Sequence, residues 1–168
     1  MTNPEPTAER PGFPRGYGIS QYQAGLMSWP DIEEKLKQSR NYWVSSTRVD
    51  GRPHAAPVWG LWLDGALLFS SDPTSIKARN LYSKPDVVIH LESGDDVVIL
   101  EGTIDTFNES DPVFGSFVKA YDAKYGIRIE PNPDFAYFRL QPATAMAWLE
   151  SDYPNTAPRW HFAPDTSR

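Results

Sequence analysis

Two Asp-Gly pairs most strongly constrain how this chain folds. They lie at residues 50–51 and 64–65 and separate three runs rich in β-forming residues, "NYWVSSTR", "HAAPVWGLWL" and "ALLFSS". An Asp-Gly pair between apolar strands favours a tight reversal of the chain, because both residues tolerate positive φ. The sequence therefore predicts three neighbouring antiparallel strands between residues 41 and 71.

Further strands are expected after residue 85. "DVVIHLE" and "DVVILEGTIDTF" flank the turn sequence "SGDD", while "FAYFRLQP", "TAMAWLES" and "PRWHF" predict two closing strands and a short last one. Helices are expected at "SWPDIEEKLKQS", "TSIKARNL" and "ESDPVFGSFVKAYDAKYG", with Ser28 and Ser110 as candidate caps of the first and the last. Many short strands in hairpin order with few helices predict a mainly β fold, a single antiparallel barrel with peripheral helices.

Length and composition favour one globular domain. A chain of 168 residues with 40% hydrophobic content can bury a core, and the proline-rich residues 1–18 predict a flexible arm ahead of a single domain over residues 19–168. With no cysteine and three separated histidines, no metal site is expected. No apolar run reaches the roughly 20 residues that span a bilayer, and no signal peptide is evident, so a cytoplasmic protein is expected. The net charge of −6 argues against a nucleic-acid partner.

The helix expected at "TSIKARNL" begins with bases although the chain is acidic. A helix N-terminus carries partial positive charge, so its first turn favours Asp or Glu. A solvated helix face is one explanation of Lys77 and Arg79. The other is an anion site at a helix start capped by Ser or Thr, because free backbone N–H groups, the hydroxyls of Thr74 and Ser75 and the Lys77 ammonium are the donors that a phosphate needs. Asn80, one turn later, adds an amide donor or ties the loop down.

A tryptophan-bearing strand is expected next to the proposed anion site. Trp59 and Trp62 stand in "WGLWL", and a core role is the simpler interpretation of both. Gly60 between them suggests that something flat approaches the backbone closely.

Three motifs follow one another in a fixed order along residues 42–102: "DGRPH" with "PVW", then "KARNL", then "VVILEG". In this order they resemble the split β-barrel flavin and deazaflavin oxidoreductases, the superfamily that includes the pyridoxamine 5′-phosphate oxidases. The resemblance is strongest to the F420-dependent branch called the B group. It implies a split antiparallel barrel of the FMN-binding type, a homodimer with cofactor sites built from both chains, and F420 or FMN as cofactor, with F420 slightly preferred.

The resemblance also implies a set of cofactor-binding residues. Lys77 and Ser75 would hold the cofactor phosphate, and Asn80 would support its loop. The strand "HAAPVW" would run under the ring. The other residues implied to line the site, the last three of them from the partner chain, are Ser46, Thr47, His54, Val58, Trp59, Ser70, Ser71, Trp148, Arg159 and Trp160.

The expected function is an oxidoreductase that transfers a hydride between the bound cofactor and a small conjugated substrate, with the chemistry carried by the cofactor. No catalytic acid or base is assigned. In true pyridoxamine phosphate oxidases an Arg usually stands at the position of Ile76, so oxidation of that vitamer is not expected. The alternative is a non-catalytic flavin or tetrapyrrole carrier on the same barrel.

Overall fold

Both Asp-Gly pairs reverse the chain in the computed structural model, which describes residues 5–12, 14–132 and 134–163. Strands β2 (Asn41–Thr47), β3 (Pro53–Leu63) and β4 (Ala66–Ser71) are consecutive antiparallel neighbours. At the second turn, Asp64 and Gly65 have φ of 50° and 78°, which is the left-handed conformation that such a tight hairpin requires. The prediction of three antiparallel strands in this region is confirmed.

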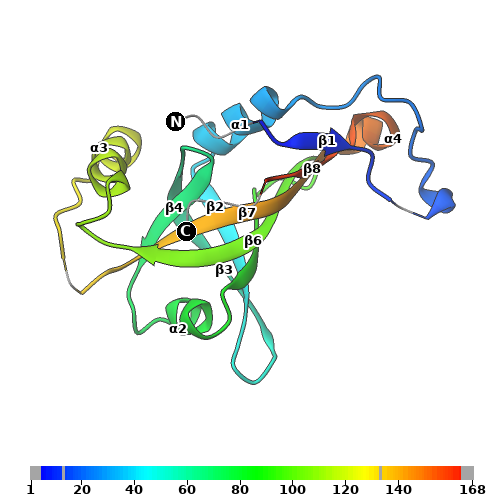
Figure 1. Cartoon of the computed structure of the whole chain (residues 1–168). Coiled ribbons are helices and arrows are strands. Elements are labelled where there is room, and N and C mark those ends of the chain that lie inside the picture. Colours follow the sequence, from blue (N-terminus) through cyan, green and yellow to red (C-terminus); the bar gives the residue numbers. More distant parts are fainter. Residues whose placement is uncertain (1–4, 13, 133, 164–168) are drawn as a thin grey trace.

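Six strands of the described chain close into a barrel (Figure 1). The other three are β5 (Asp86–His90), β6 (Asp96–Phe107) and β7 (Ala136–Leu149). The order around the barrel is β7-β4-β3-β2-β5-β6, and pairing of β6 with β7 closes the ring. Beyond the end of β4, strand β7 pairs with β8 (Arg159–His161), which in turn pairs with β1 (Thr7–Glu9). The mainly β class and the split-barrel fold are confirmed.

Strand β7 corrects one prediction. The sequence predicts two closing strands separated near Pro142, but the structure has one continuous strand. Its register with β6 shifts between Glu101 and Gly102, which leaves room for Pro142 within the sheet. A Cβ atom on Gly102 would lie 2.1 Å from the carbonyl oxygen of Gln141, so only glycine fits this irregularity.

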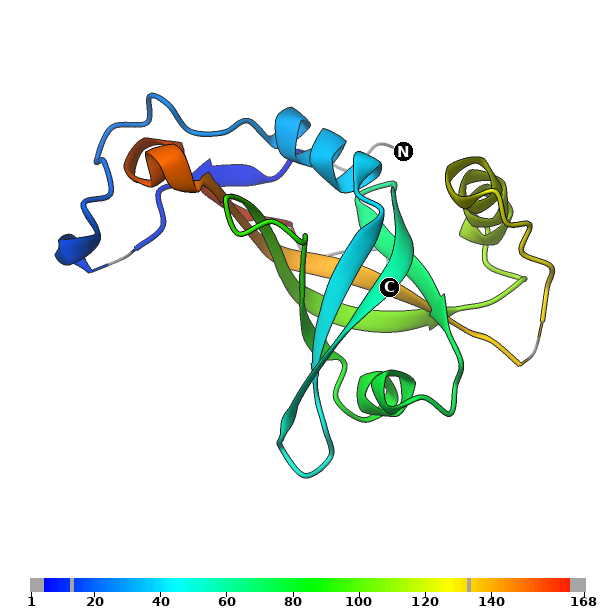
Figure 2. The same ribbon diagram turned by 180° about the vertical axis from the view of Figure 1, so that it is seen from behind.

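Helices α1 (Trp29–Gln38) and α2 (Ile76–Ser83) lie at opposite ends of the barrel (Figures 1 and 2). Ile32 and Leu36 of α1, and Ala78 and Leu81 of α2, enter the same apolar core inside the barrel. The predicted cap of α1 is confirmed, because the Ser28 hydroxyl accepts a hydrogen bond from the Asp31 amide at 3.3 Å. The two helices therefore close the barrel at its ends.

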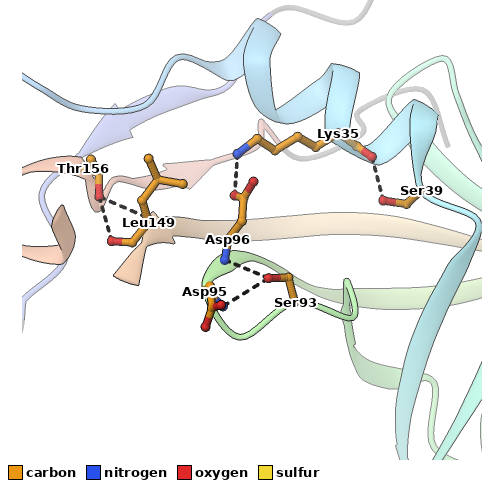
Figure 3. A network of polar contacts seen from close by, with 7 residues as sticks. All are labelled: Lys35, Ser39, Ser93, Asp95, Asp96, Leu149 and Thr156. Atoms are coloured by element: carbon orange, nitrogen blue, oxygen red, sulfur yellow. Dashed lines mark hydrogen bonds and ion pairs between the residues drawn. The ribbon is translucent and has the colours of Figure 1, made fainter. Parts of the chain in front are cut away.

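A polar network attaches α1 to the turn between β5 and β6 (Figure 3). Lys35 forms an ion pair with Asp96, the first residue of β6. The amide of Asp96 donates to the Ser93 hydroxyl at 2.9 Å, and the amide of Asp95 donates to the same oxygen at 3.1 Å. The Ser39 hydroxyl donates to the Lys35 carbonyl at 2.7 Å. Lys35 of α1 is thus paired within the chain.

Helix α3 (Val113–Tyr125) covers the outer face of β3 and β4. Its side chains Phe117 and Tyr121 form a second, smaller core against these strands. The prediction that Ser110 caps it is wrong. The Ser110 hydroxyl donates to Asn108 at 2.6 Å, and the carboxylate of Asp111 accepts from the Val113 amide at 3.0 Å instead.

The first and last described strands, β1 and β8, pair with each other. The predicted flexible arm includes β1, and Arg10 donates to the Asn155 carbonyl at 2.7 Å. Flexibility of the arm stays a prediction, and its residues 1–4 and 13 lie outside the described chain. Short helices complete the structure: η1 (Arg15–Tyr17), η2 (Glu150–Asp152) and α4 (Tyr153–Thr156). In the part of the chain described, no helix is both long and apolar enough to cross a membrane.

Candidate functional site

The loop from β4 to α2 folds into the predicted helix cap. The Ser75 hydroxyl accepts from the Ala78 amide at 3.1 Å and lies 3.1 Å from the Ser71 hydroxyl. Asp72 accepts from both the amide and the hydroxyl of Thr74 at 2.7 Å, and these hydrogen bonds lower the pKa of its carboxyl group. The loop is therefore ordered by its own side chains before any ligand binds.

Lys77 is the charged residue of this helix start. The first turn of α2 contains no acidic residue, and Lys77 forms no ion pair or hydrogen bond with any described residue. The side chain is half-buried, and this burial lowers the pKa of its ammonium group. A desolvated cation without a counter-ion is unfavourable, so the surroundings of Lys77 favour an anionic ligand.

Asn80 ties α2 to the barrel. Its side-chain amide donates to the Ser46 hydroxyl at 3.0 Å, and that hydroxyl lies 3.4 Å from the His54 carbonyl on the neighbouring strand. Asn80 and Ser46 are only 4% and 5% exposed. Of the two roles considered for Asn80, the structure favours support of the loop. Thr47 continues β2 beside them, paired with Pro53.

His54 carries an unpaired polar atom in this region. Its Nδ1 is buried and has no hydrogen-bond partner among the described residues. Buried polar atoms are nearly always paired, so an unpaired one beside a candidate site indicates a position where a ligand or water completes the structure.

Ser70 and Ser71 point to opposite faces of β4, because successive side chains of a strand alternate. Ser71 faces the barrel side with Phe69. Ser70 instead lines a cavity of about 520 Å³ between the end of α3 and the start of β7, together with Tyr121 and Tyr137. Burial raises the pKa of both tyrosine hydroxyls, which keeps them protonated hydrogen-bond donors. The structure therefore does not bring Ser70 and Ser71 to one surface.

Val58 and Trp59 are likewise separated by strand alternation. Val58 lies inside the barrel core at 7% exposure. Trp59 lies outside and stacks on Tyr125 with ring centroids 4.8 Å apart, and the Arg40 guanidinium lies 4.8 Å from the Trp59 ring. The flat group expected close to Gly60 belongs to the protein itself. A Cβ there would lie 3.3 Å from the ring of Tyr42 and 3.0 Å from a carbonyl oxygen of β4.

The three residues expected from the partner chain lie on β7 and β8, away from α2 (Figure 1). Trp148 packs edge-on against Tyr153 at 5.5 Å. Arg159 contacts the Met146 sulfur at 3.3 Å, and its buried Nε has no partner among the described residues. Trp160 is 1% exposed within the core, so its side chain is not available to line a cofactor site.

Sequence reasoning missed Arg48, which lies with Arg79 beside α2. A cavity of about 410 Å³ lies between the tip of the β2–β3 hairpin and α2, where Arg48 and Arg79 line it together with the acid Asp50. Neither arginine forms an ion pair with a described acid, whereas Arg52 nearby is paired with Asp50 at 2.8 Å. Only the fold brings Arg48 toward Arg79, and the one sequence signal is its position two residues before an Asp-Gly pair.

The sequence comparison gives the family. A family model described as pyridoxamine 5′-phosphate oxidase matches residues 28–149, which include the barrel strands β2 to β7 and helices α1 to α3. The chain belongs to the pyridoxamine 5′-phosphate oxidase family. No protein with curated function matches the sequence. The predicted membership of this superfamily is thereby confirmed.

Solved structures share the fold of this family member. An FMN-binding protein related to pyridoxamine 5′-phosphate oxidase, from Nostoc punctiforme, is 15% identical, with 85% of this chain and 95% of that chain covered and a TM-score of 0.60. A structure described as an F420 reductase is 23% identical, with 67% and 94% covered and a TM-score of 0.53. HutZ, described as the haem storage protein from Vibrio cholerae, is 17% identical, with 68% and 89% covered and a TM-score of 0.57. At these identities the likenesses show the fold alone.

Proposed function

We propose that this member of the pyridoxamine 5′-phosphate oxidase family is an oxidoreductase that binds F420 or FMN through its phosphate at the start of α2. It would transfer a hydride to or from a small conjugated substrate. The observation that carries the proposal is the half-buried Lys77 ammonium, which has no partner among the described residues. It lies in the first turn of α2, two residues after the N-cap Ser75.

The residues at this helix start fit a phosphate monoester or diester. The first amide groups of an α-helix have no intrahelical acceptor, and the helix dipole favours an anion at that end. Ser75 adds a hydroxyl group, and Lys77 adds a charge-assisted donor. A bound phosphate would offset the cost of holding the Lys77 charge away from water.

The bound flavin or deazaflavin would supply the hydride chemistry. The protein's own residues bind and orient the cofactor. Asn80 and Ser46 hold α2 against β2, so the phosphate-binding residues stay in a fixed position relative to β3. Arg48 and Arg79 line the adjacent basic cavity, and they suit a ligand with a further anionic tail. This feature supports the slight preference for F420, which carries a polyglutamyl tail.

The outer face of the barrel supports the proposed homodimer. A row of side chains stands in register across the strands β7, β6, β5, β2 and β3, on the face opposite the core. The row consists of Met146, Ile99, His90, Trp43 and Pro57. None of the five is buried, although most are large and apolar. A largely apolar row that is not buried within its own chain is typical of an interface, and a second copy of this chain presents a matching row.

Sedimentation velocity tests the dimer. The wild type should sediment as a dimer, and Ile99→Asp should produce monomers because it places a charge in the centre of the row. Ile127→Asp is the matched control, since Ile127 is 46% exposed outside the row. A monomeric wild type, or equal effects of the two variants, would contradict the assignment of this face.

Titration of the purified protein with FMN, FAD and F420 tests the cofactor proposal. At least one should bind well below millimolar concentration, and Lys77→Ala should weaken that binding. Lys119→Ala is the control, because Lys119 is exposed on α3. If none of the three cofactors binds tighter than about 1 mM, or about −4 kcal/mol, the proposed function is wrong.

The carrier alternative makes the same demand on Lys77 but none on turnover. One structural neighbour is described as a haem storage protein, which keeps this alternative in view. Cofactor bound without hydride transfer to any of a panel of conjugated acceptors would favour the carrier. Binding of haemin in place of all flavins would identify a tetrapyrrole carrier.

A further inference from the structure

Lys124, in the last turn of α3, places its side-chain nitrogen against the barrel. Its Nζ donates to the Tyr42 hydroxyl at 2.9 Å and to the Gly60 carbonyl at 3.1 Å. The rings of Tyr42 and Tyr125 have their centroids 5.1 Å and 5.4 Å from the same atom. No described carboxylate pairs with Lys124, whereas Lys35 and Lys37 both have acidic partners.

The hydrogen bonds around Lys124 match a neutral amine. The Tyr42 hydroxyl donates its proton to the Leu36 carbonyl, so it can only accept from Lys124. The second acceptor is the Gly60 carbonyl. A neutral amine has two N–H groups and one lone pair, whereas an ammonium has three N–H groups. Two acceptors therefore pair both N–H groups of the amine and leave its lone pair unused, whereas one N–H of the ammonium would have no acceptor in the described chain.

The faces of the two rings attract an ammonium, but burial and the charges around Lys124 favour the neutral amine. Burial lowers the pKa of its ammonium group to about 8. Burial also raises the pKa of the hydroxyls of Tyr42 and Tyr125, so neither becomes a counter-ion. Arg40, 5.7 Å from the Tyr125 ring, adds a second cation nearby, and Asp122 on the same helix faces solvent.

We propose that Lys124 is a reactive lysine whose amine is acylated by small activated acyl donors, such as acyl phosphates, in preference to the exposed lysines of this chain. The lone pair of Nζ attacks the acyl carbon and forms an amide C–N bond. The bond between the acyl carbon and the phosphate oxygen breaks, phosphate leaves with the bonding electrons, and one amine proton passes to solvent. This proposal does not depend on the proposed oxidoreductase function.

Acylation would change how α3 is attached to the barrel. The product amide keeps a single N–H group, so it cannot donate to both Tyr42 and Gly60. The end of α3 would lose one of its hydrogen bonds to β2 and β3. Tyr121, one turn earlier on the same helix, lines the cavity beside Ser70, so the modification reaches the wall of that cavity.

Competitive labelling of the full-length folded protein tests the proposal. Trace acetyl phosphate is added over a range of pH, and peptide mass spectrometry gives the acetylation rate of each lysine. At about pH 7.5 Lys124 should react about tenfold faster than Lys119, because its larger neutral fraction outweighs the lower nucleophilicity of a weaker base. The rate for Lys124 should rise with a midpoint near 8.

Labelling in concentrated urea provides the control. Unfolding removes Tyr42 and Gly60 from Lys124, so the two lysines should then react at nearly equal rates. The proposal is overturned if folded Lys124 reacts no faster than Lys119, if its midpoint lies near that of an ordinary lysine, or if its advantage persists in urea.

Discussion

Helices α1 and α2 close opposite ends of one barrel, but they differ in whether their lysines are paired with acidic residues. On α1, Lys35 pairs with Asp96 and Lys37 pairs with Glu33 at 3.1 Å. On α2, no described acid pairs with Lys77. Both helices bury apolar residues in the same core, so core packing does not explain the difference. The basic residues of α1 are therefore paired within the chain, whereas Lys77 of α2 has no described partner and is free to pair with the anionic ligand that we propose.

The largest expected effect is on the stability contributed by α1. Leu36→Ala removes a side chain that is 1% exposed in the barrel core, so the free energy of unfolding should fall by about 2–5 kcal/mol. Urea denaturation measures this change. The affinity of the remaining folded protein for cofactor should stay unchanged, and a parallel loss of affinity would break the distinction between the helices.

Asn80→Ala separates the structural residue of α2 from its binding residue. The substitution removes the hydrogen bond to Ser46 and leaves that buried hydroxyl with one partner fewer, so unfolding should become easier by about 1–3 kcal/mol. Thermal unfolding in the absence of ligand measures it. Unchanged stability together with lost cofactor affinity would instead make Asn80 a direct ligand of the cofactor.

Lys124 extends the comparison to α3 through the pH dependence of stability. The pKa of its ammonium is about 8 in the folded chain, against the ordinary lysine value of 10.5 that applies to the unfolded chain. Between these two pH values the unfolded chain therefore binds more protons. Stability should therefore rise with pH, by about 1 kcal/mol between pH 7 and 9.5 after allowance for partial exposure. Lys124→Met should lack this rise, as denaturation curves at each pH would reveal. An equal rise in both proteins would remove Lys124 as its cause.

The smallest expected effect compares two lysines directly. Lys35→Met loses a partly exposed ion pair, so stability should fall by about 0.5–1 kcal/mol. Lys77→Met removes a half-buried cation that has no described partner, so stability should not fall. Chemical denaturation of the two variants at low salt measures both. A larger loss in Lys77→Met would mean that Lys77 has a structural role.

Local signals in the sequence predict much of the fold. The Asp-Gly turns and the Ser28 and Ser75 caps depend on neighbouring residues, and the structure has all of them. The continuity of β7 across Pro142 could not be predicted, because it depends on Gly102, which lies far away in the sequence. For the same reason the sequence did not indicate that Trp160 is a core residue.

The candidate site is predictable only in part. Lys77 and Ser75 stand out because the first turn of a helix favours acidic residues, and the basic residue found there instead can be recognised from a few neighbouring positions. The basic cavity of Arg48 and Arg79 and the attachment of Lys124 to Gly60 arise from contacts between distant segments. A strand also presents neighbouring residues to opposite faces, so Ser70 and Ser71 cannot both belong to one surface of β4.

The most direct test of the proposed phosphate site compares the binding of FMN and of riboflavin, which lacks the phosphate, to the wild type and to Lys77→Ala. Isothermal titration of the four combinations isolates the interaction between Lys77 and the phosphate. Lys77→Ala should weaken FMN binding by about 1.5–3 kcal/mol, or about 10- to 150-fold, and should leave riboflavin binding unchanged. If FMN does not bind, F420 and its phosphate-free deazaflavin core replace the pair. Equal losses for the two ligands, or no loss for either, would contradict the assignment of Lys77 to the cofactor phosphate.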